Sequence, residues 1–448
     1  MIFNHPYRYV AERVVRSFGT DFDFVFSEIR NGEFKVEARR GGRIAALSGE
    51  CGGDEKTRLC AALYDALHAL TGISPAWGIF TGVRPVKYIR ESGRDDDYFT
   101  DKMKIRADKL ALAREIAEVQ KGVVNDIPEN SFHLYVGIPF CPSRCGYCSF
   151  VSEAVGKSEH LIPRYVSLLI RELELIGDYS RKTGRRPDTV YIGGGTPTAL
   201  PLNEQARVYE AVANSFDLSA VREYTVEAGR PDTLDASVLR EIKLAGVDRV
   251  SINPQSMNDR VLGAIGRGHT ARDAVKAYET ARAASFAGIN MDLIAGLPTE
   301  GADGFIGGLK RVIALKPDNI TVHGLAFKKG SRLSRNAKPP FAEGLTGAAY
   351  AVLREYGYFP YYMYRLRESG TDGDNIGYSR SKDKIGMYNV FVMDENTSVL
   401  AAGCAGATRL AVNGDMRKCY NFKYPHEYIS RFDELIENKF RLFGGITD

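Results

Sequence analysis

The sequence predicts an α/β fold built on a partial (β/α)6 barrel, and two observations support this prediction. Short runs of β-branched or aromatic residues alternate with amphipathic stretches from about residue 132 onward. Such alternation is typical of βαβ units in a parallel sheet. Six units are recognisable, and no eighth is evident. The barrel should therefore be open on one side rather than closed.

The predicted barrel elements follow one another at regular spacing. The strands are expected over 134–140, 188–195, 223–228, 248–254, 289–297 and 319–325. The helices are expected over about 159–182, 203–215, 234–245, 271–286 and 303–315. In parallel barrels the chemistry lies at the carboxyl ends of the strands, where the loops converge. Most of the candidate site residues named below lie at or just after the carboxyl ends of these predicted strands.

Two further regions flank the barrel, which we place at 128–330. Asn31-Gly32 between two alternating runs predicts a hairpin, and helices over 55–71 and 98–121 complete a small α+β domain at 1–127. Residues 331–448 are expected to form a mixed domain that covers the substrate. Its expected elements are a helix over 343–356, strands over 387–393 and 397–403, and a terminal helix over 425–439.

Composition excludes several classes of protein. The chain has 448 residues and a net charge of +4, from 60 basic and 56 acidic residues. This balance argues against a polybasic nucleic-acid arm or an acidic tail. No apolar run reaches the roughly 18 residues of a membrane span, and charges interrupt the N-terminus too often for a signal peptide. We expect a cytoplasmic protein that binds no nucleic acid. The seven cysteines, an odd number, argue against a disulfide framework.

Three of the cysteines lie within eight residues, as Cys141, Cys145 and Cys148 in the spacing CxxxCxxC. Thiolates at such spacing suit a soft metal centre. A structural zinc site needs four ligands, and His133 and His160 flank the group only at a distance. A [4Fe–4S] cluster held by three cysteines keeps one iron free for another ligand. The spacing therefore predicts a cluster, with zinc or inert core cysteines as the alternatives.

The cysteine loop, with Tyr147 before its last cysteine, resembles that of the radical S-adenosylmethionine (SAM) superfamily. The flanking string YVGIPFCPSRCGYCSF is similar to the oxygen-independent coproporphyrinogen III oxidase family. The strings GIFTGVRPVK at 78–87 and PYYMYR…DNIGY…MYN at 360–389 resemble its N-terminally extended HemZ subtype. The resemblance implies two cofactors, a [4Fe–4S] cluster on the three cysteines and SAM.

The resemblance also implies which residues contact SAM, and several of them are unusual for their position. The glycines at 193–195 would let backbone groups approach a ligand closely, although a tight turn is an equal alternative. An acid inside an apolar strand, as at Asp292, needs a polar partner. The implied SAM contacts are Tyr135, Tyr147, Gly194, Gly195, Thr196, Glu227, Gln255, Arg267 and Asp292.

The implied activity is an oxidative decarboxylation in haem biosynthesis. A 5′-deoxyadenosyl radical would take hydrogen from two propionates of coproporphyrinogen III, and loss of CO₂ would give protoporphyrinogen IX. The implied partners are a tetrapyrrole and a reducing donor such as a flavodoxin or ferredoxin. Ser149 follows the motif, where some family members with this activity carry a further cysteine. A haem chaperone and radical chemistry on another tetrapyrrole, as in anaerobic haem breakdown, therefore stay open.

A tyrosine-dense strip in the C-terminal region allows two interpretations. Tyr356, Tyr358, Tyr361, Tyr362 and Tyr364 could be core residues, or they could form an aromatic wall for a macrocycle. In the second case, Arg365 and Arg367 would be available to substrate carboxylates. His323, at the end of the sixth strand, is the histidine best placed for a role in the site.

Overall fold

The computed structural model describes residues 1–448 except 151, 327–343, 367–372, 413 and 445–448. The chain divides into two compact units, Met1–Glu118 with Met363–Arg367, and Val119–Tyr362 with Glu368–Asp448. The three domains at 1–127, 128–330 and 331–448 stay a prediction. No helix of the described residues is both long and apolar enough to cross a membrane.

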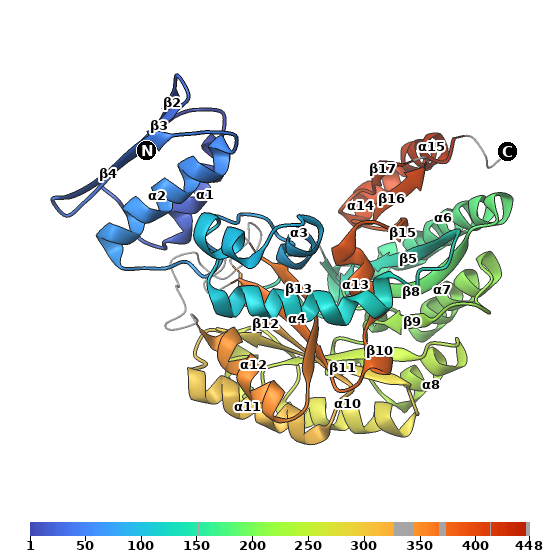
Figure 1. The fold of residues 1–448 in the computed structure, drawn as a ribbon. Helices are drawn as coiled ribbons and strands as arrows, with labels where there is room; N and C mark the ends of the chain where they lie inside the picture. Colours follow the sequence, from blue (N-terminus) through green and yellow to red (C-terminus); the bar gives the residue numbers. More distant parts are fainter. Residues whose placement is uncertain (151, 327–343, 367–372, 413, 445–448) are drawn as a thin grey trace. The chain divides into compact units, whose positions relative to one another are not determined.

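The first unit contains a four-stranded sheet with the order β1-β2-β3-β4 (Figure 1). The predicted hairpin is confirmed, because Arg30 pairs with Glu33 across Asn31 and Gly32. Both turn residues have positive φ, 56° and 80°, as a two-residue hairpin turn requires. The elements are β1 (Ile2–Asn4), α1 (Arg8–Ser17), β2 (Phe24–Arg30), β3 (Glu33–Arg40), β4 (Arg43–Glu50), α2 (Glu55–Thr71), α3 (Pro85–Glu91), η1 (Tyr98–Lys102) and the start of α4 (Ala107–Val124).

The second unit contains the predicted partial barrel. Its six strands are neighbours in chain order and pair in parallel: β5 (Ser131–Ile138), β8 (Arg186–Gly194), β9 (Glu223–Val226), β10 (Arg249–Gln255), β11 (Gly288–Ala295) and β12 (Asn319–Gly324). The connecting helices are α6 (Ile162–Thr183), α7 (Leu202–Ser215), α8 (Ala236–Leu244), α9 (Asp259–Ala264), α10 (Ala271–Ala283) and α11 (Ala302–Leu315). The longer helices follow the outer side of the strands (Figure 1). The predicted fold class is confirmed.

The barrel is open because its first and last strands pair with other partners. β12 pairs antiparallel with β14 (Asp374–Ser379). The next strand in the sheet beyond β14 is β13 (Phe359–Arg365). β5 pairs in parallel with β15 (Val399–Gly403), and Val399 lies opposite His133. The sheet therefore grows at both edges with strands from the C-terminal part of the chain and reaches eleven strands.

The remaining elements of the second unit are short or lie near the C-terminus. They are β6 (Phe140–Cys141), β7 (Glu153–Ala154), α5 (Val155–Ser158), η2 (Glu159–Leu161), η3 (Pro197–Ala199), η4 (Pro231–Thr233), α12 (Leu345–Glu355), η5 (Lys382–Lys384), α13 (Met387–Asp394), β16 (Ala407–Val412), β17 (Asp415–Tyr420), α14 (Pro425–Ser430) and α15 (Phe432–Leu442).

The prediction of a strand over 387–393 is wrong, because this segment forms the helix α13. Its apolar, β-branched composition is typical of a strand. However, the buried carboxylate of Glu223 accepts the N–H groups of Met387 at 2.6 Å and Tyr388 at 3.2 Å. A negative charge at the first turn satisfies free helical donors and interacts favourably with the helix dipole. This distant carboxylate favours the helix.

Candidate functional site

The three clustered cysteines lie on and after the short strand β6, beyond the carboxyl end of β5. The loop is anchored by its backbone, since the N–H of Gly146 donates to the carbonyl of Ile265 at 2.9 Å. Cys145 is buried, and Cys141 and Cys148 are half-buried. The loop thus holds its thiols at the end of the barrel where catalytic groups gather.

The three thiols are close enough to influence one another. Burial raises the pKa of Cys148, and the neighbouring Cys141 and Cys145 raise this pKa further. A zinc site would need its ligands to converge on one ion at about 2.3 Å from each sulfur. A cluster distributes its thiolates over several irons. The donor set fits a [4Fe–4S] cluster.

The glycine loop after β8 packs against the start of the cysteine loop. A Cβ at Gly195 would lie 2.6 Å from the carbonyl oxygen of Phe140, and Gly194 has a φ of 110°. The N–H of Thr196 donates to that same carbonyl at 2.7 Å, and its hydroxyl lies 3.4 Å from the Sγ of Cys141. The glycines are therefore needed for contact between two backbone segments. The turn they form places Thr196 beside the first cysteine.

Glu227, just beyond the end of β9, faces the same loop. Its Oε2 accepts the N–H of Gly194 at 3.2 Å. Burial raises the pKa of Glu227 to about 7, a shift that hydrogen bonds from Tyr191 and Gly194 partly offset. The Tyr191 ring stacks on Tyr388 at 4.5 Å, and Tyr135 lies 6.4 Å from both of these rings. A layer of stacked tyrosines thus lies beside the carboxyl group.

Asp292 and His323 form a pair on the neighbouring strands β11 and β12. The Nε2 of His323 is 3.5 Å from the Oδ2 of Asp292, and the Nδ2 of Asn290 donates to Oδ1 at 2.6 Å. Burial alone would lower the pKa of His323, but the hydrogen bond and charge of Asp292 raise it. The polar partner that Asp292 needs inside an apolar strand is therefore present.

Gln255 has two features that point to an absent ligand. It adopts a left-handed φ of 68° at the end of β10, a conformation that costs energy for a residue with a side chain. Its Oε1 is buried and has no hydrogen-bond partner in the part of the chain that the structure describes. Buried polar atoms are normally satisfied, so this oxygen is suited to meet a donor from a bound molecule such as SAM.

Arg267 reaches from the segment after α9 to the cysteine loop. Its guanidinium donates to the hydroxyl of Tyr147 at 2.8 Å and to the carbonyl of Gly229 at 3.3 Å. The structure therefore brings Tyr147 and Arg267 together directly. Glu227 lies near enough to Tyr135 and to Asp292 for their charges to interact. The roles of these residues toward SAM stay predictions.

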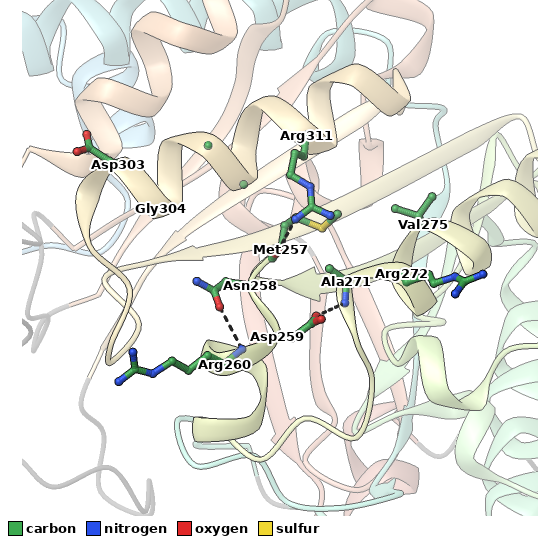
Figure 2. Close-up of a pocket in the computed structure, with 12 residues that line it drawn as sticks. Met257, Asn258, Asp259, Arg260, Ala271, Arg272, Val275, Asp303, Gly304 and Arg311 are labelled. Atoms are coloured by element: carbon green, nitrogen blue, oxygen red, sulfur yellow. Dashed lines mark hydrogen bonds between the residues drawn. The ribbon is translucent and has the colours of Figure 1, made fainter.

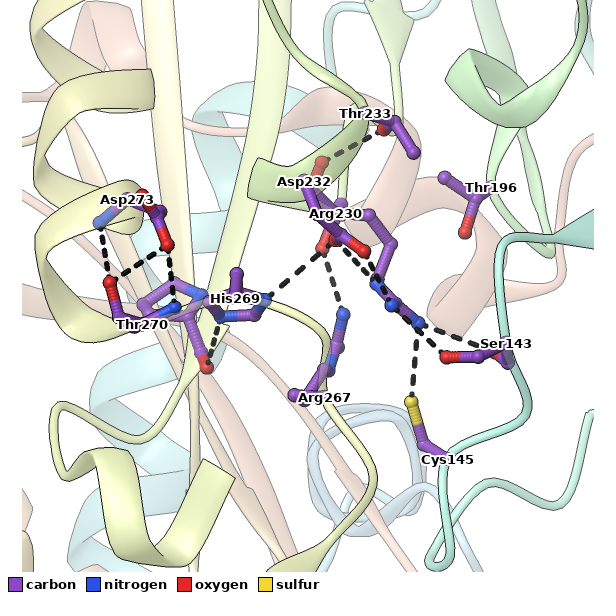
Figure 3. Close-up of polar contacts among 12 residues, drawn as sticks. Ser143, Cys145, Thr196, Arg230, Asp232, Thr233, Arg267, His269, Thr270 and Asp273 are labelled. Atoms are coloured by element: carbon purple, nitrogen blue, oxygen red, sulfur yellow. Dashed lines mark hydrogen bonds and ion pairs between the residues drawn. The ribbon is translucent and has the colours of Figure 1, made fainter. Parts of the chain in front are cut away.

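Sequence reasoning missed a second arginine beside the cysteines (Figure 3). Arg230 is buried and donates to the Sγ of Cys145 at 3.6 Å. It pairs with Asp232, and His269 lies beside that carboxylate. An arginine after a glycine is usually a solvated surface residue. The sequence held one indication of a role for Arg230: it lies three residues after Glu227, beyond the end of a predicted strand.

The tyrosine strip supports the core interpretation for three of its residues. Tyr358, Tyr361 and Tyr362 are buried, and Tyr356 is exposed. Arg365 is engaged within the first unit, where it lies over the Trp77 ring and donates to the carbonyl of Phe80 at 2.8 Å. Arg367 lies outside the described residues.

A separate hollow of about 780 Å³ lies among the starts of α9, α10 and α11 (Figure 2). Arg260, Arg272 and Arg311 are among its lining residues. None of the predicted site residues lines this hollow, so it does not belong to the candidate site.

Residues 135–307 match the family described as the radical SAM superfamily. The sequence is 34% identical over 412 residues to the oxygen-independent coproporphyrinogen-III oxidase-like protein HemZ of Bacillus subtilis (strain 168), covering 88% of this chain and 82% of that protein. It is 30% identical to the haem chaperone HemW of Escherichia coli (strain K12), over 57% of this chain and 68% of that protein.

Among solved structures, the fold is similar to that of coproporphyrinogen III oxidase (HemN) from Escherichia coli, described as a radical SAM enzyme. The TM-score is 0.52 at 23% identity, over 71% of this chain and 72% of that one. This likeness concerns the fold alone.

Proposed function

Because the chain belongs to the radical SAM superfamily, and within it to the family of the HemZ coproporphyrinogen-III oxidase-like proteins, we propose that it converts coproporphyrinogen III to protoporphyrinogen IX without oxygen. The cofactors of this superfamily are a [4Fe–4S] cluster and SAM. When bound, they supply the one-electron chemistry that removes a hydrogen atom from an unreactive carbon. The observation that carries the proposal is the extent of the similarity to HemZ, which goes well beyond the barrel into both flanking regions.

The residues of the site have distinct tasks in this proposal. Cys141, Cys145 and Cys148 hold the cluster. Glu227 accepts a hydrogen bond from the ammonium group of SAM. The guanidinium of Arg267 pairs with the carboxylate of SAM. Asp292, oriented by His323, accepts hydrogen bonds from the ribose hydroxyls.

The stacked rings of Tyr135, Tyr191 and Tyr388 would help to exclude water from the surroundings of Glu227. A radical reaction requires such a site, because water and other hydrogen donors would divert it. The tetrapyrrole and the external electron donor would meet the protein around this end of the barrel.

The test is an anaerobic assay of the protein with reconstituted cluster, SAM, dithionite and coproporphyrinogen III, followed by product mass. We expect two successive steps, each of which removes CO₂ and two hydrogen atoms. The Cys145→Ala variant serves as the control for non-enzymatic conversion. Unchanged substrate under conditions where SAM is cleaved would reject the proposal.

Haem binding without conversion is the second candidate. Two observations favour it, the similarity to HemW and the Ser149 that follows the cysteine motif. In that case haem would bind tightly and stoichiometrically, and the porphyrinogen would stay intact. Cleavage of SAM that depends on another tetrapyrrole would instead indicate chemistry on a different substrate.

A further inference from the structure

The guanidinium of Arg230 is packed directly against Cys145. The residue is 3% exposed, and its NH1 lies 3.6 Å from the Sγ of Cys145 and 3.3 Å from the carbonyl oxygen of Ser143. The NH2 group also donates to the hydroxyl of Ser143 at 3.2 Å. Arg230 thus contacts both the cysteine loop's backbone and one of its sulfurs (Figure 3).

We propose that Arg230 is a positioning residue that donates a fixed N–H···S hydrogen bond to the Cys145 thiolate and thereby raises the reduction potential of the cluster. The inference rests on the proposed assignment of Cys145 as a cluster ligand. It concerns the cluster alone, whatever tetrapyrrole the protein converts or binds.

Arg230 is held in place from its other side. Asp232 accepts from Nε at 2.9 Å and from NH2 at 2.8 Å, a two-point contact that fixes the plane of the guanidinium. The Nδ1 of His269 is 3.8 Å from the same carboxylate. Burial alone would raise the pKa of Asp232, but His269 and Arg230 lower it well below its usual range, so the carboxylate stays ionised.

The two other cysteines have weaker donors. Cys141 meets the neutral hydroxyl of Thr196 at 3.4 Å, and Cys148 receives a backbone N–H from Phe150. Within the described residues, Cys145 alone has a guanidinium at hydrogen-bond distance from its sulfur. Charge-assisted hydrogen bonds are roughly twice as strong as neutral ones. The hydrogen bonding of the cysteines is therefore asymmetric: the charge of Arg267 acts on both Cys145 and Cys148, but the guanidinium hydrogen bond of Arg230 is made to Cys145.

This asymmetry acts on the redox equilibrium. Reduction adds one electron from an external donor to the cluster and breaks no bond, so the cluster and its thiolates become more negative by one charge. A fixed cationic donor stabilises that reduced form more than the oxidised form. Hydrogen bonds to the sulfurs and net charge are recognised determinants of cluster potentials.

The experiment is a reductive titration of the reconstituted protein without substrate, followed by the electron paramagnetic resonance of the reduced cluster. Arg230→Gln removes the charge and the two-point contact. At a fixed potential, we expect the ratio of reduced to oxidised cluster to fall about tenfold, which equals about 59 mV for one electron. Arg230→Lys should recover part of the shift. Arg272→Gln, which removes an exposed charge on α10, should leave the potential unchanged.

Iron and sulfide content establish that each variant carries a full cluster. A full cluster with the wild-type potential in Arg230→Gln would overturn the proposal. If that variant takes up no cluster, Asp232→Asn is titrated in its place, because it weakens the two-point contact that fixes the guanidinium beside Cys145 and keeps all three cysteines. A wild-type potential in Asp232→Asn would then overturn the proposal. Failure to convert coproporphyrinogen III affects neither measurement, so the two proposals fail separately.

Discussion

The hydroxyl of Tyr147 accepts a 2.8 Å hydrogen bond from the guanidinium of Arg267, a residue 120 positions later in the chain. The contact joins the cysteine loop to the segment that follows α9. If both residues contact SAM, the cluster site and the SAM site share one hydrogen bond. A change to this bond should affect SAM more than the cluster.

The Tyr147→Phe variant tests this relationship. Phe keeps the ring but leaves a buried guanidinium N–H without its acceptor, and a hydrogen bond to a charged group contributes about 1.5–3 kcal/mol. We expect SAM to bind about tenfold more weakly while the iron content stays at the wild-type level. Equilibrium binding of SAM measures the effect, and Tyr420→Phe, at an exposed tyrosine, is the control. Equal affinity in Tyr147→Phe and wild type would exclude a role for this bond.

The Cys145→Ala variant tests the assignment of the cluster ligands. A cluster held by two cysteines should not survive, so the broad iron–sulfur absorption at about 400 nm should be lost. The fold should persist, because the cysteine loop lies beyond the strand ends. Cys419→Ala, in β17, removes a thiol outside the cluster and should keep the full absorption. Full iron and sulfide content in Cys145→Ala would contradict the assignment.

A buried ion pair should contribute strongly to stability. The Nζ of Lys439 lies 3.1 Å from Glu172, and both side chains are fully buried. Glu172 also accepts from the N–H of Gly403 and from the hydroxyl of Tyr428. The Glu172→Gln change leaves a buried ammonium without a counter-charge, and we expect the free energy of unfolding to fall by about 3–5 kcal/mol.

Urea denaturation measures this loss. The matched control is Glu434→Gln in the exposed pair Arg431–Glu434, which should cost no more than about 1 kcal/mol. Adding Lys439→Met to Glu172→Gln should restore part of the stability, because it removes the unpaired charge. A loss of similar size in Glu172→Gln and Glu434→Gln would show that the buried pair has no special weight.

His133 should make stability depend on pH. Burial, together with the charges of Arg222 and Arg409, lowers its pKa to about 3. In the unfolded chain the group titrates near 6.5. As the pH falls below about 6.5, only the unfolded chain takes up the proton, so the folded state loses about 1.4 kcal/mol per pH unit until the folded pKa is reached.

Urea denaturation at about pH 6.5 and pH 5 measures this dependence. The wild type should lose about 2 kcal/mol more between the two pH values than His133→Gln, which has no such proton to bind. His426→Gln, at an exposed histidine, should behave as the wild type does. Parallel pH profiles for wild type and His133→Gln would refute the expectation. Although Asp188 lies 4.0 Å from His133, it forms two shorter hydrogen bonds with Arg222 and leaves the histidine neutral.

The sequence predicted the elements whose signals are local. The barrel strands and their helices follow from the alternation of apolar runs and amphipathic stretches, and Asn31-Gly32 was sufficient for the hairpin. The segment around 387–393 was predicted wrongly because its helix depends on Glu223, a residue far away in the chain. The pairing of β15 with β5 was equally out of reach, since no local pattern specifies a partner strand.

The same distinction applies to the candidate site. Glu227, just after an apolar run, and Asp292, inside one, stand out in the sequence because acids are rare at such positions. Arg230 does not stand out, since its burial depends on Asp232 and the cysteine loop folding around it. Tyr388 comes from a helix that the sequence suggested as a strand, so its ring against Tyr191 could not be foreseen.

The pairing of β15 with β5 has a consequence for the order in which the protein is made. Val399 lies opposite His133, so 266 residues separate the two partners along the chain. At about 5–20 residues per second, a ribosome needs roughly 15–50 s to synthesise that stretch. During this time one edge of the first barrel strand lacks its partner, and unpaired edges readily join strands of other chains. The nascent barrel is therefore vulnerable to aggregation until its C-terminal strands emerge.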